Sequence, residues 1–250
     1  MAVKLEKFVD ETKVKIGFPA HCCFIGKTFS GKTFLASGVI NRIDEIFSRK
    51  METYILIVLS PYKEIEDCIL RQLNSKWTVI HFSVNVFTED TLNQVINYLQ
   101  TKKMLGNEIV LLIDDLMIQT VTSTNISTFL VRAFAMFRHH NISVMATVQS
   151  SSSSLLDVLQ NSTFIFVMQT FGCFQILSKI IRTMLGVINV PSLIRKIYPL
   201  LEDERKGSYI FVNIAHEADR NQLFTISNDV FADIGFTKRY LYALSTECNQ

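Results

Sequence analysis

The sequence lacks long apolar runs: none approaches the ~18 residues that a membrane-spanning helix needs. Its first residues mix lysine and glutamate and contain no hydrophobic signal-peptide core. The five cysteines show no spacing typical of a metal site, and an odd count with two adjacent residues argues against a disulfide framework. We therefore expect a soluble protein with no membrane partner, in a reducing, intracellular setting.

A strong net charge is also absent, since 25 lysines and arginines stand against 23 aspartates and glutamates, for a formal charge of +2. Proteins that bind nucleic acid through a global electrostatic footprint usually carry far more positive charge. Any contact with DNA must therefore be local or shared among subunits. No internal repeat divides the 250 residues, and 48% of them are hydrophobic, which is enough for one large core.

The strongest motif is GKTFSGKT at residues 26–33, which fits G-x-x-x-x-G-K-[ST], the Walker A pattern, at every fixed position. The apolar run Ala20–Ile25 precedes it, and apolar residues at helical spacing follow it. Phosphate binding needs this strand–loop–helix context, because loop N–H groups and the positive helix end then face the anion. We predict that Lys32 binds the β- and γ-phosphates and that Thr33 binds Mg²⁺. The predicted nucleotide-binding loop consists of Gly26, Lys27, Thr28, Phe29, Ser30, Gly31, Lys32 and Thr33.

Two adjacent carboxylates, Asp114 and Asp115, end the apolar run Ile109–Ile113. In P-loop enzymes, the strand that carries the Mg²⁺-associated acid lies beside or near the P-loop strand, with its carboxyl end towards the nucleotide. This Walker B reading makes Asp114 the metal partner, together with Thr33, and Asp115 the base or water-positioning residue. Taken alone, two acids at a strand end are also common in turns and helix caps.

Gln149 directly follows the predicted strand 142–148. A glutamine beside the γ-phosphate orients the attacking water in several P-loop NTPases. The alternative is that Gln149 only opens the polar serine run that follows it. With Lys32 and Asp115, it completes the predicted catalytic set.

The remaining periodicity predicts an α/β chain with a mostly parallel central sheet flanked by helices. Besides the strands already named, we expect strands at 54–59, 77–82 and 163–168. Helices are expected at 33–50, 64–73, 88–103, 127–140, 175–185 and 192–201. Two further runs, 207–213 and 222–227, predict an antiparallel pair at the edge of the sheet.

The expected organisation is an N-terminal arm at 1–18, a P-loop ATPase domain at 19–235 and a C-terminal tail at 236–250. The arm ends at the break Gly17–Pro19 and reads as a peripheral strand or arm. The tail is short and rich in aromatic residues.

Four segments together resemble one family: residues 26–33, 113–117, 137–144 (FRHHNISV) and 148–149. This combination is similar to the FtsK/HerA-type genome-packaging ATPases of poxvirus-like large DNA viruses, virophages and Polinton (Maverick) elements. The resemblance covers residues 18–230. It implies a P-loop NTPase fold of the RecA/ASCE type, in which an extra strand separates the P-loop strand from the acid-bearing strand.

The resemblance also implies an activity: ATP hydrolysis that drives double-stranded DNA into a capsid, with ATP and Mg²⁺ as cofactors. It implies a homo-oligomeric ring that contacts a capsid vertex or other virion proteins. The expected location is the host cytoplasm (virus factory) or nucleus, or the virion itself. An arginine from a neighbouring subunit would stabilise the transition state. The candidates are Arg132, Arg138 and Arg182.

The chain departs from the family pattern in two places. Residues 168–171 (MQTF) replace an Asn-Pro-Arg-Asp-like turn, and residues 223–226 (LFTI) replace an arginine-rich segment. Two other functions therefore stay open. One is a nucleotide-dependent structural or regulatory protein that binds DNA or a capsid without pumping, and the other is a small-molecule P-loop kinase, for which no convincing arginine-bearing lid is present.

Overall fold

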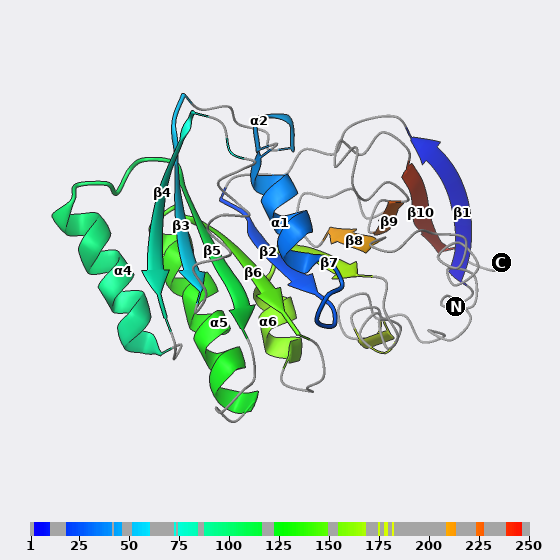
Figure 1. Ribbon diagram of the computed structural model, residues 1–250. Coiled ribbons are helices and arrows are strands. Elements are labelled where there is room, and N and C mark those ends of the chain that lie inside the picture. Colours follow the sequence, from blue (N-terminus) through cyan, green and yellow to red (C-terminus); the bar gives the residue numbers. More distant parts are fainter. Residues whose placement is uncertain are drawn as a thin grey trace.

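A sheet of ten strands organises the computed structural model, with helices on both of its faces (Figure 1). The order of the strands across the sheet is β1-β10-β9-β8-β7-β2-β6-β5-β3-β4. The structure describes residues 3–10, 19–41, 43–46, 52–60, 73, 75–84, 88–116, 123–149, 155–168, 175, 178–179, 182, 209–213, 224–227 and 239–246.

Six neighbouring strands of this sheet are parallel to one another. They are β2 (His21–Ile25), β3 (Tyr54–Ser60), β4 (Trp77–Ser83), β5 (Ile109–Leu116), β6 (Ser143–Val148) and β7 (Phe164–Met168). The fully buried, mostly apolar runs of β2, β3, β6 and β7 suit strands that are covered on both faces, whereas the edge strand β4 is only partly buried. Strand β6 lies between β2 and β5, so the predicted extra strand between the P-loop and the acid pair is confirmed.

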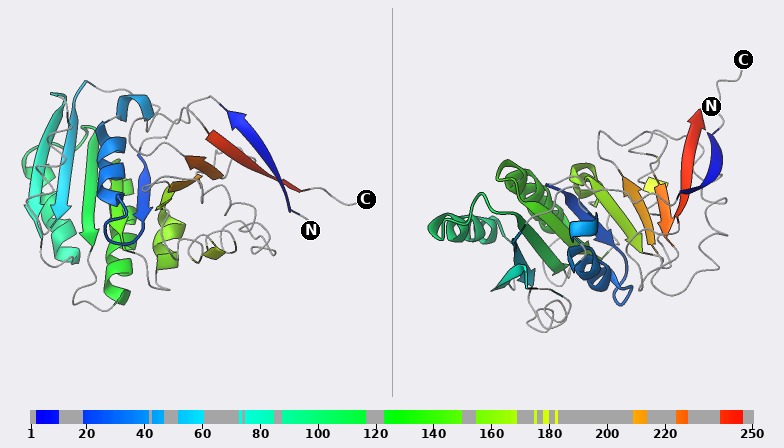
Figure 2. Two further views of the ribbon diagram at one scale, coloured as in Figure 1. Left: turned by 45° about the vertical axis from the view of Figure 1, so that its right-hand side comes forward. Right: turned by 90° about the horizontal axis from the view of Figure 1, so that it is seen from above.

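The rest of the sheet is antiparallel. The predicted pair is present as β8 (Tyr209–Asn213) and β9 (Phe224–Ser227), and β8 joins the parallel part through β7. This pair does not end the sheet, because β10 (Arg239–Thr246) and then β1 (Val3–Asp10) follow it. Figure 2 shows these two terminal strands side by side.

Helices α1 (Lys32–Asn41) and α2 (Ile43–Ile46) cover one face of the sheet. Helices α4 (Glu89–Thr101), α5 (Ser123–His139) and α6 (Leu155–Asn161) cover the other. Successive side chains of a strand point to opposite faces of the sheet, so the core has one part on each face. In β2, for example, Cys22 and Phe24 pack with the α1 side, whereas Cys23 and Ile25 pack with the α5 side.

Helix α5 stops at a turn that depends on Asn141, whose φ of 57° lies in the left-handed region. The N–H of Ile142 donates to the carbonyl of Phe137 (3.0 Å), and the N–H of Asn141 donates to that of Arg138 (3.1 Å). These two bonds form a Schellman helix stop, in which asparagine is one of the few side chains tolerated. The turn sends the chain directly into β6.

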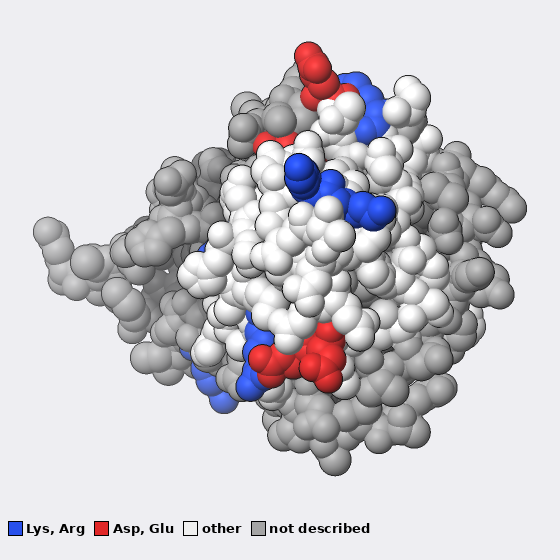
Figure 3. All heavy atoms as spheres, turned by 90° about the vertical axis from the view of Figure 1, so that its left-hand side faces the viewer, with Lys and Arg blue, Asp and Glu red and all other residues white. Residues whose placement is uncertain are grey.

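Helix α4 carries charge that matches its dipole, with Glu89 and Asp90 in its first turn and Lys102 and Lys103 just after its end. The exposed residues between these ends are uncharged, and Figure 3 shows a broad uncharged area between an acidic and a basic group on this side. Glu89 also forms an ion pair with Arg132, which links α4 to α5.

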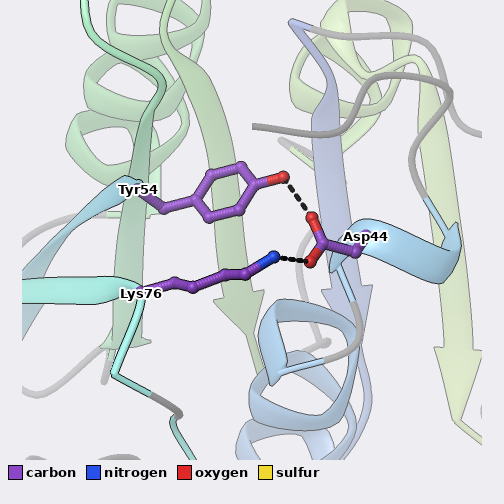
Figure 4. A network of polar contacts seen from close by, with 3 residues as sticks. All are labelled: Asp44, Tyr54 and Lys76. Carbon is purple, nitrogen blue, oxygen red and sulfur yellow. Dashed lines mark hydrogen bonds and ion pairs between the residues drawn. The ribbon is translucent and has the colours of Figure 1, made fainter. Parts of the chain in front are cut away.

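A polar cluster fixes α2 against the amino ends of β3 and β4 (Figure 4). The carboxylate of Asp44 accepts hydrogen bonds from Tyr54 Oη and Lys76 Nζ, both at 2.6 Å. The Tyr54 ring stacks on Trp77 with its centroid 4.8 Å away. The cluster therefore lies at the amino ends of β3 and β4.

Some predicted elements lie outside the described residues. This applies to residues 47–50 of the first predicted helix, to residues 64–72 and to the helix at 192–201. Within 175–185, the four described residues are all helical. None of the described helices combines the length and apolar character needed to cross a membrane.

Candidate functional site

The three sequence signals meet at one edge of the sheet. The loop at 26–31 follows β2, the acid pair lies at the end of β5, and Gln149 follows β6 (Figure 1). The N–H of Gly26 donates to the carbonyl of Val148 at 3.2 Å, which ties the start of the loop to the end of β6. The carboxyl ends of parallel strands are where ligands bind in open α/β sheets.

The loop takes the tight conformation that its glycines allow. Gly31 has φ of 90°, just before α1 begins at Lys32. A Cβ on Gly26 would lie 2.5 Å from Ser30 Oγ and 2.8 Å from Met168 Cβ, so β7 leaves no room for a side chain there. Phe29 also has a positive φ, 61°, and its side chain is 90% exposed at the loop surface.

Lys32 and Ser30 present donors inside this loop. The buried Lys32 reaches back over the loop, and its Nζ donates to the carbonyl of Lys27 at 2.7 Å. Ser30 Oγ is buried and has no hydrogen-bond partner among the described residues. The first turn of α1 contains no acidic residue, so its positive end is not neutralised. An ammonium group, an unsatisfied hydroxyl and a helix N-terminus fit the oxygens of a bound phosphate.

Asp114 is fully buried and lies beside two hydroxyl groups. Thr33 Oγ1 is 2.9 Å from its Oδ1 and 3.1 Å from its Oδ2, and Thr147 Oγ1 donates to Oδ1 at 2.6 Å. A hydroxyl next to a carboxylate provides hard oxygens of the kind that Mg²⁺ prefers. Among the described residues, no group of three or more His, Cys, Asp or Glu side chains is arranged to hold a metal ion. In P-loop sites, phosphate oxygens and water complete the coordination of Mg²⁺.

Thr147 was not among the residues predicted from the sequence. It is the one hydroxyl among the apolar residues at the end of β6, on the same face as Met145, which packs on the α1 side. A lone polar residue at the carboxyl end of a buried strand, two positions before Gln149, is the signal that could have identified it.

The acid pair coincides with a β-bulge. Ile113 pairs with Ala146, whereas Leu116 pairs with Val148, so two residues of β5 stand opposite one of β6. Bulges occur often beside active sites, where they re-aim side chains. The side chain of Asp115 lies outside the described part of the chain, so its role as a base stays a prediction.

Gln149 contacts the loop itself, since Thr28 Oγ1 donates to its Oε1 at 3.1 Å. The predicted catalytic glutamine and the predicted phosphate loop are therefore neighbours. Their separation along the chain is 121 residues, and the parallel arrangement of β2 and β6 brings them together.

The arginine candidates contact other parts of the chain. Arg132 pairs with Glu89, as described above, and Arg138 Nη2 lies 3.3 Å from the carbonyl of Asn161 and 3.4 Å from Nδ1 of His21. His21 is the first residue of β2, so Arg138 lies at the edge opposite the loop. Burial, and secondarily Arg138, lowers the pKa of His21 from 6.5 to about 4. Arg182 is exposed.

No protein-family model and no curated protein sequence matches this chain. Its structure is similar to that of B204, the genome packaging NTPase of Sulfolobus turreted icosahedral virus 2, in complex with ATPγS, with a TM-score of 0.53 and 14% identity over 85% of this chain and 98% of B204. The structure of B204 in complex with AMPPCP aligns with the same TM-score, identity and coverage. B204, the DNA-packaging ATPase of Sulfolobus turreted icosahedral virus, aligns over 86% of this chain and 100% of its own, again at 14% identity and a TM-score of 0.53. The similarity confirms the predicted fold class: the chain has a P-loop NTPase fold like that of B204.

Proposed function

We propose that the protein is an ATPase of the FtsK/HerA type that drives double-stranded DNA into a viral or virus-like capsid. The observation that carries the proposal is the pair of contacts Thr33–Asp114 and Thr28–Gln149. These contacts bring the loop, the acid strand and the glutamine into one site, as nucleotide hydrolysis requires. The B204 structures support it, because they are packaging NTPases solved with ATP analogues.

When ATP binds, the ammonium group of Lys32 changes its hydrogen-bond acceptor. The Nζ that rests on the carbonyl of Lys27 turns to the β- and γ-phosphate oxygens, because an ionised acceptor makes a stronger hydrogen bond than a neutral one. The loop N–H groups and the start of α1 hold the remaining phosphate oxygens. Thr33 and Asp114 would hold Mg²⁺, which would neutralise charge on the β- and γ-phosphates.

Hydrolysis then needs an oriented water. The Gln149 amide positions the water, and Asp115 orients it or accepts its proton. The water oxygen bonds to the γ-phosphorus while the bond from phosphorus to the bridging oxygen breaks, which releases ADP and phosphate. The bulge between Ile113 and Leu116 supports this division of roles, because the backbone departs there from the regular strand, as it often does beside active sites.

Coupling to DNA requires an assembly, and we propose a homo-oligomeric ring built from the domain at 19–235. Arg132, Arg138 and Arg182 are all exposed and are the candidates for the arginine offered to the neighbouring subunit, although Arg132 and Arg138 also bond within their own subunit. The ring would act at a capsid vertex or on other virion proteins, in the host cytoplasm or nucleus or in the virion. Because the net charge is only +2, DNA binding would depend on charge gathered from several subunits.

The test is the rate of ATP hydrolysis with and without duplex DNA, together with particle mass in the presence of ATP. Lys32→Ala should abolish nucleotide binding. Asp115→Asn should keep binding and lose about 10²–10⁴-fold in rate, which is typical for loss of a general base. Asp90→Asn, an exposed acid in the first turn of α4, is the matched control and should hydrolyse ATP at the wild-type rate. Wild-type rates for Lys32→Ala and Asp115→Asn would refute the assignment of the site.

A second candidate is a nucleotide-dependent structural or regulatory protein that binds DNA or the capsid without pumping. The low net charge of +2 favours it, since a protein that pumps DNA needs positive charge along the path of the DNA. This candidate predicts slow hydrolysis that duplex DNA does not change, whereas the translocase predicts stimulation by DNA.

A further inference from the structure

Asp114 receives hydrogen bonds from two sides of the site. Thr33 approaches from the start of α1, which follows β2, and Thr147 approaches from β6. Thr147 is 1% exposed and Asp114 is 0% exposed, so this part of the site is shielded from water. Shielding matters because a buried carboxylate depends on protein donors in place of water.

The two threonine hydroxyls contact the carboxylate oxygens of Asp114 at different distances. Oδ1 lies 2.6 Å from the Thr147 hydroxyl and 2.9 Å from the Thr33 hydroxyl, whereas Oδ2 lies 3.1 Å from Thr33. A distance of 2.6 Å is in the range of a strong hydrogen bond to an ionised oxygen. Thr147 therefore fixes Oδ1, and Thr33, which lies near both oxygens, contacts each at a longer distance.

This asymmetry assigns different tasks to the two threonines. Thr33 would bind a cation through a lone pair of its hydroxyl oxygen while its O–H donates to Asp114. Thr147 donates to Oδ1 from the neighbouring strand β6. We propose that Thr147 is a positioning residue for the Mg²⁺ site, because its hydrogen bond to Oδ1 fixes the orientation of the Asp114 carboxylate beside Thr33. The proposal rests on the proposed nucleotide-hydrolysing function.

The strand gives Thr147 a second connection. Thr147 is the second-last residue of β6, and Gln149 directly follows the strand. Gln149 accepts a hydrogen bond from Thr28 of the phosphate loop. The hydroxyl of Thr147 thus joins the acid of β5 to the same strand end that carries the glutamine.

The experiment measures binding of a fluorescent, non-hydrolysable ATP analogue while Mg²⁺ is titrated, so that it does not depend on turnover. Thr147→Val keeps the shape of the side chain and removes the hydroxyl. It should raise the half-saturating Mg²⁺ concentration by roughly 10–100-fold, as loss of a group that orients a metal ligand does. Its affinity for the analogue without Mg²⁺ should match that of the wild type. Thr147→Ser, which keeps the hydroxyl, should restore the wild-type Mg²⁺ dependence.

Thr163→Val is the matched control, since it removes the hydroxyl that donates to the His21 carbonyl at the opposite edge of the sheet. It should leave the Mg²⁺ dependence unchanged. An unchanged Mg²⁺ dependence in Thr147→Val, or a serine variant that behaves like the valine variant, would overturn the role of Thr147 alone. If Thr147→Val does not fold, Thr147→Ala against Thr147→Ser gives the same comparison. Wild-type binding that ignores Mg²⁺ would overturn the proposed function, and this role with it.

Discussion

Protonation of His21 should limit the stability of the fold below neutral pH. His21 is 1% exposed at the start of β2, and its pKa is lowered from 6.5 to about 4 by burial first and by Arg138 second. Its Nδ1 faces the guanidinium of Arg138, which can only donate, so the ring accepts there in its neutral form. A proton on Nδ1 would place two positive groups against each other in a buried site.

The sign of the effect follows from which state binds the proton. Between pH 6.5 and pH 4 the unfolded chain protonates this histidine and the folded protein does not, so stability rises with pH in that window. The contribution is complete above pH 6.5 and is lost as the pH falls towards 4. From pH 7 to pH 5 the expected loss is about 2 kcal/mol, obtained from the two pKa values by proton linkage.

Urea unfolding of the wild type and of His21→Asn at pH 7 and pH 5 tests this value. Asparagine keeps an acceptor near the position of Nδ1 but does not titrate. The loss of unfolding free energy between the two pH values should be smaller in the variant by about 2 kcal/mol. Arg138→Gln should reduce the pH sensitivity only in part, because burial is the larger cause. A variant with the full pH sensitivity of the wild type would refute the reasoning.

Substitutions at four further positions test particular contacts. Gly26→Ala should lower the free energy of unfolding by about 1–3 kcal/mol through overpacking, because its Cβ would lie 2.5 Å from Ser30 Oγ. It should also weaken nucleotide binding. Unfolding and binding curves that match the wild type would contradict this. Asn141→Ala should cost about 1 kcal/mol in urea unfolding because of its left-handed φ, whereas Asn141→Gly should be close to neutral; equal loss in both would contradict it. Tyr54→Phe should cost about 1.5 kcal/mol through its lost bond to the Asp44 carboxylate. Lys76→Met at the same carboxylate should cost less than about 1 kcal/mol because Lys76 is exposed, and the reverse ranking would count against this assignment.

Much of the site was predictable because it is encoded locally. An apolar run followed by a polar residue marks the carboxyl end of a buried strand, and parallel strands bring those ends together. The loop at 26–33, Asp114 and Gln149 were each expected at the carboxyl end of a parallel strand, and they lie there in the structure. Thr147 could not be predicted, because its importance depends on the carboxylate of the neighbouring strand, which the sequence pattern does not show.

The pairing of the strands near the two ends of the chain also could not be predicted from the sequence. Residues 3–10 and 239–246 form an antiparallel pair, which extends the sheet past β8 and β9. Alternating patterns identify a strand but not a partner more than 200 residues away. The arm and the tail therefore read as peripheral pieces, although each provides a strand of the same sheet.

The segment FRHHNISV, which carried much of the resemblance, has a structural explanation. Asn141 makes the helix stop, Arg138 bonds to the carbonyl of Asn161, and Ser143 Oγ accepts a hydrogen bond from the N–H of Ala20. All three lie at the edge where β2 and β6 begin, away from the phosphate loop. The segment therefore acts on the site indirectly, through the placement of β6.

Strand β6 is the physical link between the two halves of the site. Because β6 lies between them, β2 and β5 are about 10 Å apart, two strand spacings. Contacts from β6 span this gap: Val148 accepts from Gly26, Gln149 accepts from Thr28, and Thr147 donates to Asp114. A small shift of this strand would therefore move its contacts to the loop and to Asp114 together, so the position of β6 fixes the distance between the loop at 26–31 and the acid of β5.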